Sequence, residues 1–278
     1  MRFDSFAMVD WSSGNDTGPR PRKDAVWAGA VLNGNEIEPV YLRNREVAVA
    51  SLTALIDDEL AAGRRLLIGF DFPFGYPSGF AEAVTGSRDP LTLWAYYAEH
   101  LDDTPKGNNR FDLAGALNAR FPGVGPFWFN GLARDIPDLP RKGRARSGHG
   151  MAERRRVESL AKGTFSCWQM GGAGAVGGQV MTGLAALQTL RHAFGDKIAV
   201  WPFQDLRAPV AFVETWPSLI DAAVRSARDD IRDRAQVRLM ARALARTPPR
   251  ILSEMMHCDA PEEGWILGLG YEDCLKEA

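Results

Sequence analysis

The chain has 278 residues, of which 45% are hydrophobic and 24% are charged, and its formal net charge is −2. This composition is typical of a globular protein and is long enough for one large α/β domain or two small ones. The nearly balanced charge excludes a protein attracted to nucleic acid or anionic membranes over its whole surface, so any site for a polyanion has to be local.

Three strands are predicted at the N-terminal end. The first covers residues 6–12 and contains Asp10, and the next two cover residues 25–34 and 36–44. The turn Asn33–Asn35, with the sequence NGN, joins the second strand to the third in the manner of a hairpin. We therefore expect a three-stranded antiparallel meander.

A helix and a buried strand follow the meander. Residues 46–65 carry apolar side chains at helical spacing, and Gly63 is a plausible end of the helix. Residues 66–71, with the sequence LLIGFD, form an apolar run without alternation. Such a run is typical of a strand in a parallel sheet that is covered on both faces.

The pattern becomes irregular between residues 78 and 162 and regular again after them. We interpret residues 78–162 as an insertion or sub-domain of helices and loops within a single domain that spans residues 1–278. The regular part predicts a helix at 177–195, strands at 197–203 and 210–217, and one broken or two successive helices at 218–246.

Cysteine and histidine usage limits the kind of site. Cys167, Cys258 and Cys274 are far apart and form no C-x-x-C pair, which argues against a disulfide framework or a structural zinc. The four histidines form no H-E-x-x-H pattern, so a metal would need oxygen ligands.

No signal-peptide pattern is present, and the longest uncharged run, residues 163–190, contains too many glycines and glutamines for a membrane span. We expect a cytoplasmic protein without membrane association.

Three acidic residues end predicted strands and are each followed by a turn: Asp10, Asp71 and Glu214. Ligand sites of α/β sheets lie at the carboxyl ends of parallel strands. Carboxylates gathered there repel one another unless a proton or a cation neutralises them, and such groups hold Mg²⁺ or Mn²⁺. We therefore predict that Asp10, Asp71 and Glu214 hold Mg²⁺ or Mn²⁺, although each acid alone could simply cap a turn or helix.

A fourth acid, Asp233, lies at the start of the apolar face of the last long helix. It is a candidate to complete the catalytic group, and Asp229 or Asp230 could serve in its place. The alternative is that these acids only complement the helix dipole.

Two segments are candidates for binding a substrate. Ser12 and Ser13 follow Asp10 directly and could meet a phosphate. Residues 141–156 contain seven Lys or Arg downstream of Trp128 and Phe129, a combination that suits a single nucleic-acid strand or else a solvated loop. The candidates in this segment for substrate binding are Arg144, Arg146 and Arg154.

The order of the predicted elements resembles that of ribonuclease H-like proteins. More closely, the chain resembles a family of predicted ribonuclease H-like nucleases, through VDW at residues 9–11, FDFPFGYP at 70–77 and ETWP at 214–217. The helix at 232–245 and EGWILG at 263–268 are also similar to the closing elements of that family. Residues 78–162 have no counterpart in this resemblance.

The resemblance implies a ribonuclease H-like mixed sheet with helices on both faces and a helical and loop insertion. It also implies a metal-dependent hydrolase of phosphodiester bonds, with Asp10, Asp71, Glu214 and Asp233 as its catalytic residues. Nucleic acid would then be the partner of the basic segment 141–156.

Other functions are open at this stage. Residues 10–18 resemble the first phosphate loop of actin-like and sugar kinases, so the acids could belong to a phosphotransferase or to a protein that binds a phosphorylated small molecule. Gly172, Gly174 and Gly177 fit the spacing of a dinucleotide-binding loop, although the segment before them is a poor strand. A ribonuclease H-like protein without catalysis is the third alternative.

Overall fold

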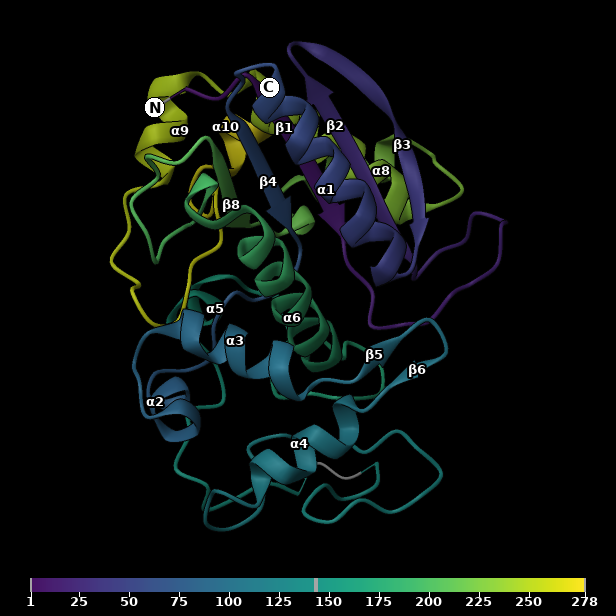
Figure 1. Cartoon of the computed structure of the whole chain (residues 1–278), viewed down its shortest axis with the longest axis vertical. Helices are drawn as coiled ribbons and strands as arrows, with labels where there is room; N and C mark the ends of the chain where they lie inside the picture. The colour runs from purple at the N-terminus through teal and green to yellow at the C-terminus, as the bar shows by residue number, and fades with distance from the viewer. Residues whose placement is uncertain (1, 143–144, 278) are drawn as a thin grey trace. The chain divides into compact units, whose positions relative to one another are not determined.

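The protein is described here by a computed structural model, which covers residues 2–142 and 145–277 and divides into two compact units (Figure 1). The first unit consists of three segments, Met1–Phe72, Leu190–Asp259 and Trp265–Ala278. The second consists of Pro73–Thr189 and Ala260–Gly264. Residues 78–162 therefore lie wholly within the second unit.

The first unit is built on a six-stranded mixed sheet with the strand order β3-β2-β1-β4-β8-β7. The strands are β1 (Ser5–Asp10), β2 (Val26–Leu32), β3 (Asn35–Arg43), β4 (Leu66–Phe70), β7 (Ile198–Val200) and β8 (Val210–Glu214). β1, β2 and β3 pair antiparallel, whereas β4 pairs parallel with β1 and β8, and β8 pairs parallel with β7. The α/β class and the N-terminal meander are thus confirmed, and the turn at Asn33 and Gly34 has the positive φ angles that a tight hairpin needs.

Helices and short 3₁₀ turns connect the strands of the first unit. They are α1 (Arg45–Ala61), η1 (Gly195–Lys197), η2 (Pro217–Ile220), α7 (Asp221–Ser226), α8 (Arg232–Arg246), α9 (Pro249–Met255) and α10 (Glu272–Glu277). The helix α6 (Gly177–Phe194) crosses the boundary between the units. The helices expected at 46–65, 177–195 and 218–246 are present, and α9 and α10 are additional. No helix in the described residues has the length and apolar character that crossing a membrane requires.

Helices α1 and α8 cover opposite faces of the sheet (Figure 1). A Cβ at Gly29 of β2 would lie 2.8 Å from the Val237 carbonyl carbon, so the backbone of α8 rests directly on this strand. On the other face the Ser5 hydroxyl donates to the Glu59 carboxylate of α1 at 2.6 Å. Gly29 pairs with Met8, and the alternation of side chains along β1 places Met8 and Ser5 on different faces.

The second unit consists of short helices and loops and has an aromatic core. Its elements are α2 (Phe80–Thr85), α3 (Pro90–His100), β5 (Asp103–Thr104), β6 (Gly107–Asn108), α4 (Arg110–Asn118) and α5 (Arg156–Leu160). Trp168 packs against Tyr76, Phe80 and Phe127 with ring centroids 4.8 to 5.1 Å apart. Because aromatic side chains bury large apolar areas, this cluster supplies much of the packing in a unit with little regular structure.

A segment from the C-terminal part of the chain, residues 260–264, belongs to the second unit. The Glu262 carboxylate accepts hydrogen bonds from the Ser78 hydroxyl and the Gly79 amide, both at 2.6 Å. The Glu263 carboxylate accepts from the amides of Ser78 and Arg156. This segment therefore holds together two loops that are far apart in the sequence.

The close approach of α8 to β2 predicts that Gly29→Ala lowers the free energy of unfolding by about 2–3 kcal/mol. The added methyl group would overlap the Val237 backbone, which cannot move without lifting the helix from the sheet. Urea unfolding followed by circular dichroism measures the change. Gly107→Ala is the matched control, since nothing lies within 4 Å of its Cβ, and it should shift stability by less than about 0.5 kcal/mol. Equal stability of both variants would contradict the contact.

Candidate functional site

Asp10 and Asp71 meet where β1 and β4 end. Val9 pairs with Phe70 in the parallel register of these strands, so the next residues, Asp10 and Asp71, are side by side. The Trp11 amide donates a hydrogen bond to Asp71 Oδ1 at 2.7 Å, and the two carboxyl groups share another hydrogen bond. Both aspartates are half-buried.

The environment of this pair favours the protonated form. Burial is the main cause that raises the pKa of Asp10 well above the ordinary aspartate value, and the charge of Asp71 adds to it. Burial also raises the pKa of Asp71, to about 7, although the hydrogen bond from the Trp11 amide opposes this shift. Near neutral pH the pair therefore carries less negative charge than two exposed aspartates would.

A third carboxylate, Asp233, joins this group from the first turn of α8. The Asp24 amide donates to Asp233 Oδ2 at 2.7 Å, which fixes the direction of the carboxylate. Burial raises the pKa of Asp233, and the charges of Asp233 and Asp24 both raise the pKa of Asp10. Arg232 opposes these charges, but its guanidinium is also bonded to Asp221 at 2.7 Å. We call Asp10, Asp71 and Asp233 the aspartate cluster.

The structure does not bring Glu214 into the aspartate cluster. Glu214 is paired with Phe70, and Phe70 is paired with Val9, so these three residues form one row across the sheet. Asp10 lies in the next row, and side chains of adjacent rows point to opposite faces. Glu214 is therefore buried on the face of the sheet opposite to Asp10. The sequence analysis grouped the two acids because the pairing register of the strands cannot be derived from the sequence of each strand alone.

The predicted three-carboxylate cage of Asp10, Asp71 and Glu214 is not found. Within residues 2–142 and 145–277, no group of three or more His, Cys, Asp or Glu side chains is arranged to hold a metal ion. The aspartate cluster instead contains a hydrogen-bonded pair of carboxyl groups and a third acid oriented by a backbone amide.

The loop that follows Asp10 is held by hydrogen bonds of Ser12 and of Arg45, a residue that the sequence analysis did not select. The Ser12 hydroxyl donates to the Asp24 carbonyl at 2.7 Å and accepts from the Gly14 amide at 3.0 Å, so the predicted substrate-binding role of Ser12 competes with these bonds. The buried Arg45 donates to the carbonyls of Ser12 and Gly14. Ser13 is half-buried in the same loop.

Asp16 and the start of α1 secure the far part of this loop. The Asn44 side chain donates to the Asp16 carbonyl at 2.8 Å and also caps α1 by accepting from the Val47 amide. The Tyr41 hydroxyl bonds the Asp16 carboxylate. The only hint of this in the sequence is an Asn immediately before a helical pattern, which marks a cap but not its second contact.

The basic segment 141–156 is only partly available as a surface. Arg155 is buried and pairs with Glu158 at 2.9 Å, so it is a structural residue of the second unit. Arg146 pairs with Glu153 and lies over the ring of Trp128. Two of the three predicted substrate-binding arginines, Arg146 and Arg154, are described, whereas Arg144 lies outside the described residues.

The glycine loop with Gly172, Gly174 and Gly177 lacks the strand that precedes the glycines in a dinucleotide-binding site. Such a site needs a strand immediately before its glycines. Among the described residues, 163–170 contain no strand and make only a single bridge, between Trp128 and Gln169. Gly177 instead has no room for a side chain because the carbonyls of Cys167 and Gln169 lie against it.

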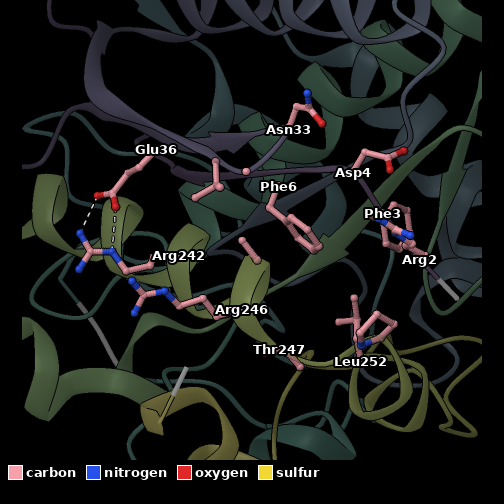
Figure 2. A pocket seen from close by; sticks show the side chains of 14 residues that line it. Arg2, Phe3, Asp4, Phe6, Asn33, Glu36, Arg242, Arg246, Thr247 and Leu252 are labelled. Atoms are coloured by element: carbon pink, nitrogen blue, oxygen red, sulfur yellow. Dashed lines mark hydrogen bonds and ion pairs between the residues drawn. The ribbon is translucent and has the colours of Figure 1, made fainter.

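A cavity of about 480 Å³ lies at the other end of the same elements, where β1 begins and α8 ends (Figure 2). Phe3 and Phe6 form part of its wall, and Arg242 on its rim is paired with Glu36 at 2.7 Å. The aspartate cluster is at the opposite ends of β1 and α8, so this cavity is separate from it.

Comparisons with protein-family models, with curated proteins and with solved structures found no match to this chain. Its function is therefore inferred from the aspartate cluster and its surroundings.

The raised pKa of Asp71 predicts a pH-dependent loss of stability. The folded protein holds this proton up to a pH of about 7, whereas the unfolded chain releases it near the ordinary value of 3.8. Stability is therefore lost as the pH rises through this interval, and Asp71→Asn removes the part of this loss that comes from Asp71. Between pH 4 and pH 8 the variant should gain about 1–2 kcal/mol relative to wild type, less than the full shift because solvent screens a half-buried carboxyl group.

Urea unfolding in the presence of EDTA at both pH values measures this difference. Asp230→Asn is the control, because Asp230 is an exposed aspartate near the start of α8. Parallel pH profiles for wild type and Asp71→Asn would contradict the raised pKa.

Proposed function

We propose that the chain is a ribonuclease H-like, divalent-metal-dependent hydrolase of phosphodiester bonds, with the aspartate cluster as its catalytic group. One observation carries the proposal: β1, the end of β4 and the start of α8 bring three aspartates together, and each has a raised pKa. Clusters of acids with perturbed pKa values are typical of functional sites, because a fold gains no stability from gathering like charges.

The sheet supports the ribonuclease H-like part of the proposal. The strand order β3-β2-β1-β4, antiparallel up to β1 and parallel beyond it, agrees with the element order in which the sequence resembles that family. The aspartates at the ends of β1 and β4 and on the late helix α8 are three of the four acids that the resemblance names. Glu214 has no role in the proposed site.

The donor set fits a hard divalent cation. Mg²⁺ is commonly held by one or two carboxylates, with water and substrate phosphate completing its shell, so a closed protein cage is not required. Asp10 and Asp71 are the residues that would hold it, with Asp233 beside them. A bound Mg²⁺ or Mn²⁺ would supply an activated water and stabilise charge on the phosphate.

Backbone amides of the chain orient two of these carboxylates. The amides of Trp11 and Asp24 orient the carboxylates of Asp71 and Asp233, and the proton shared by Asp10 and Asp71 has to leave when a cation arrives. Because the Ser12 hydroxyl already bonds Asp24 and Gly14, the geometry favours this hydrolase over a kinase-like phosphate loop.

The proposal predicts that the protein cleaves single-stranded DNA or RNA when Mn²⁺ is present and that Asp71→Asn slows cleavage by about 100-fold or more. Cleavage of labelled oligonucleotides is measured by gel electrophoresis, with EDTA as the metal-free arm. Asp230→Asn should retain wild-type activity. Equal cleavage by wild type and Asp71→Asn would assign the activity to a contaminant and remove the proposal.

A second measurement separates metal binding from catalysis. Mn²⁺ should raise the melting temperature of wild type and of Asp230→Asn, but not that of Asp71→Asn, since a ligand stabilises only the folded protein that binds it. Stabilisation without cleavage of any oligonucleotide would retain the metal site and reject the nuclease.

A further inference from the structure

The second unit presents two aromatic rings on one glycine turn. The Phe165 side chain is 53% exposed, and its ring lies against Gly174. The half-buried Phe129 ring lies against Gly171 and Gly172, 2.8 to 2.9 Å from where a Cβ of these glycines would be. Since two residues span at most about 7 Å, both rings contact the same short turn.

The backbone at Phe129 is held in a conformation that its side chain does not favour. Its φ angle is 72°, in the left-handed region that a bulky residue rarely adopts. The amides on either side fix it, since Trp128 donates to the Trp168 carbonyl at 3.1 Å and Asn130 donates to the Pro140 carbonyl at 3.0 Å. Backbone of this kind persists where the surroundings enforce it and is concentrated at binding sites.

The glycine turn beneath the rings is also rigid. The Gln169 amide group donates to the carbonyls of Gly171 and Ala173 at 3.0 and 2.9 Å, and the Ala175 amide donates to Gly172. The turn that both rings contact is therefore held in one conformation before any ligand arrives, which reduces the entropy lost on binding.

Exposed cations lie near the backbone next to each ring. Arg154 donates to the Thr164 carbonyl, next to Phe165, and its side chain is exposed. Beside Phe129, the backbone of Asn130 bridges that of Arg141 and accepts from the Lys142 amide; both of these cations are exposed, and neither has an ion-pair partner among the described residues. Residues 141–165 contain eight Lys or Arg against two Glu.

We propose that Phe129, Phe165 and the cations Arg141, Lys142 and Arg154 form a binding surface for single-stranded nucleic acid. The proposal rests on the proposed function for its role, because this surface would capture the strand that the aspartate cluster cleaves. Bases stack on the two rings, and phosphates contact the cations. Stacking of this kind tolerates any base, so the surface would bind without sequence preference.

A single strand fits this surface better than a duplex does. Exposed aromatic rings gain stacking energy only from bases whose faces are free, and the faces in a duplex are already stacked on each other. The cations alone would bind both forms through their phosphates. The contribution of the rings therefore distinguishes the two forms.

The test follows binding by the fluorescence anisotropy of labelled 20-nucleotide poly(dT) and poly(U), and of a labelled duplex of mixed sequence, in the presence of EDTA. Wild type should bind both single strands at least about tenfold more tightly than the duplex. Phe165→Leu should weaken single-strand binding by about tenfold, whereas Phe165→Tyr, which keeps a stacking ring, should remain within about twofold of wild type. Comparing the two strands shows whether DNA or RNA is preferred.

A second variant addresses charge without touching the rings. Arg141→Ala should reduce the magnitude of the slope of log K against log salt by about 0.7, the value for one phosphate contact on a single strand. Circular dichroism of each variant shows whether it is folded. Binding by Phe165→Leu equal to wild type, or a duplex bound as tightly as the single strands, would overturn the proposal.

Failure of this inference and failure of the proposed function give different results. Asp230→Asn, at an exposed aspartate outside both the aspartate cluster and the binding surface, should bind single strands like wild type. Binding without cleavage would reject only the nuclease, and cleavage that does not depend on Phe165 would reject only the binding surface.

Discussion

The contact between α8 and β2 at Gly29 determines where the aspartate cluster forms. Without a Cβ at this position, the helix backbone at Val237 rests on the strand. Asp233 precedes Val237 by four residues, about one helical turn, so the same contact holds its carboxylate beside the end of β1. The parallel register of β1 and β4 supplies the other two acids. The packing of the core and the position of Asp233 therefore both depend on the close contact between Gly29 of β2 and the backbone of α8.

The aspartate cluster works against the stability of the fold that holds it. Its members gain hydrogen bonds from the amides of Trp11 and Asp24, yet burial raises the pKa of all three, and the charge of a nearby aspartate adds to each shift. A carboxylate paired with a cation has a lowered pKa instead, as Asp229 has through its hydrogen bonds with Arg234. Neutralising the negative charge of the cluster therefore stabilises it. A proton does so in the free protein, and a bound cation would do so in the proposed enzyme.

Sequence reasoning found the elements because each follows from a local pattern, and it failed where a role depends on partners far along the chain. The apolar runs before Asp10 and Asp71 predicted two strand ends, and these do meet. Glu214 has the same local pattern, but which face a side chain takes depends on register, which is a property of paired strands. Arg155 reads as part of a basic segment, yet it is buried with Glu158 and donates to the carbonyl of Glu263, 108 residues later.

The formal net charge of −2 conceals a local excess of basic residues in one segment of the chain. The aspartates cluster in the first unit, whereas residues 141–165 of the second unit are strongly basic. Carboxylates without a cation repel a polyanion, so an enzyme that cleaves nucleic acid has to capture it with positive charge carried elsewhere. In the proposed enzyme, the exposed cations and aromatic rings of the second unit would supply that capture.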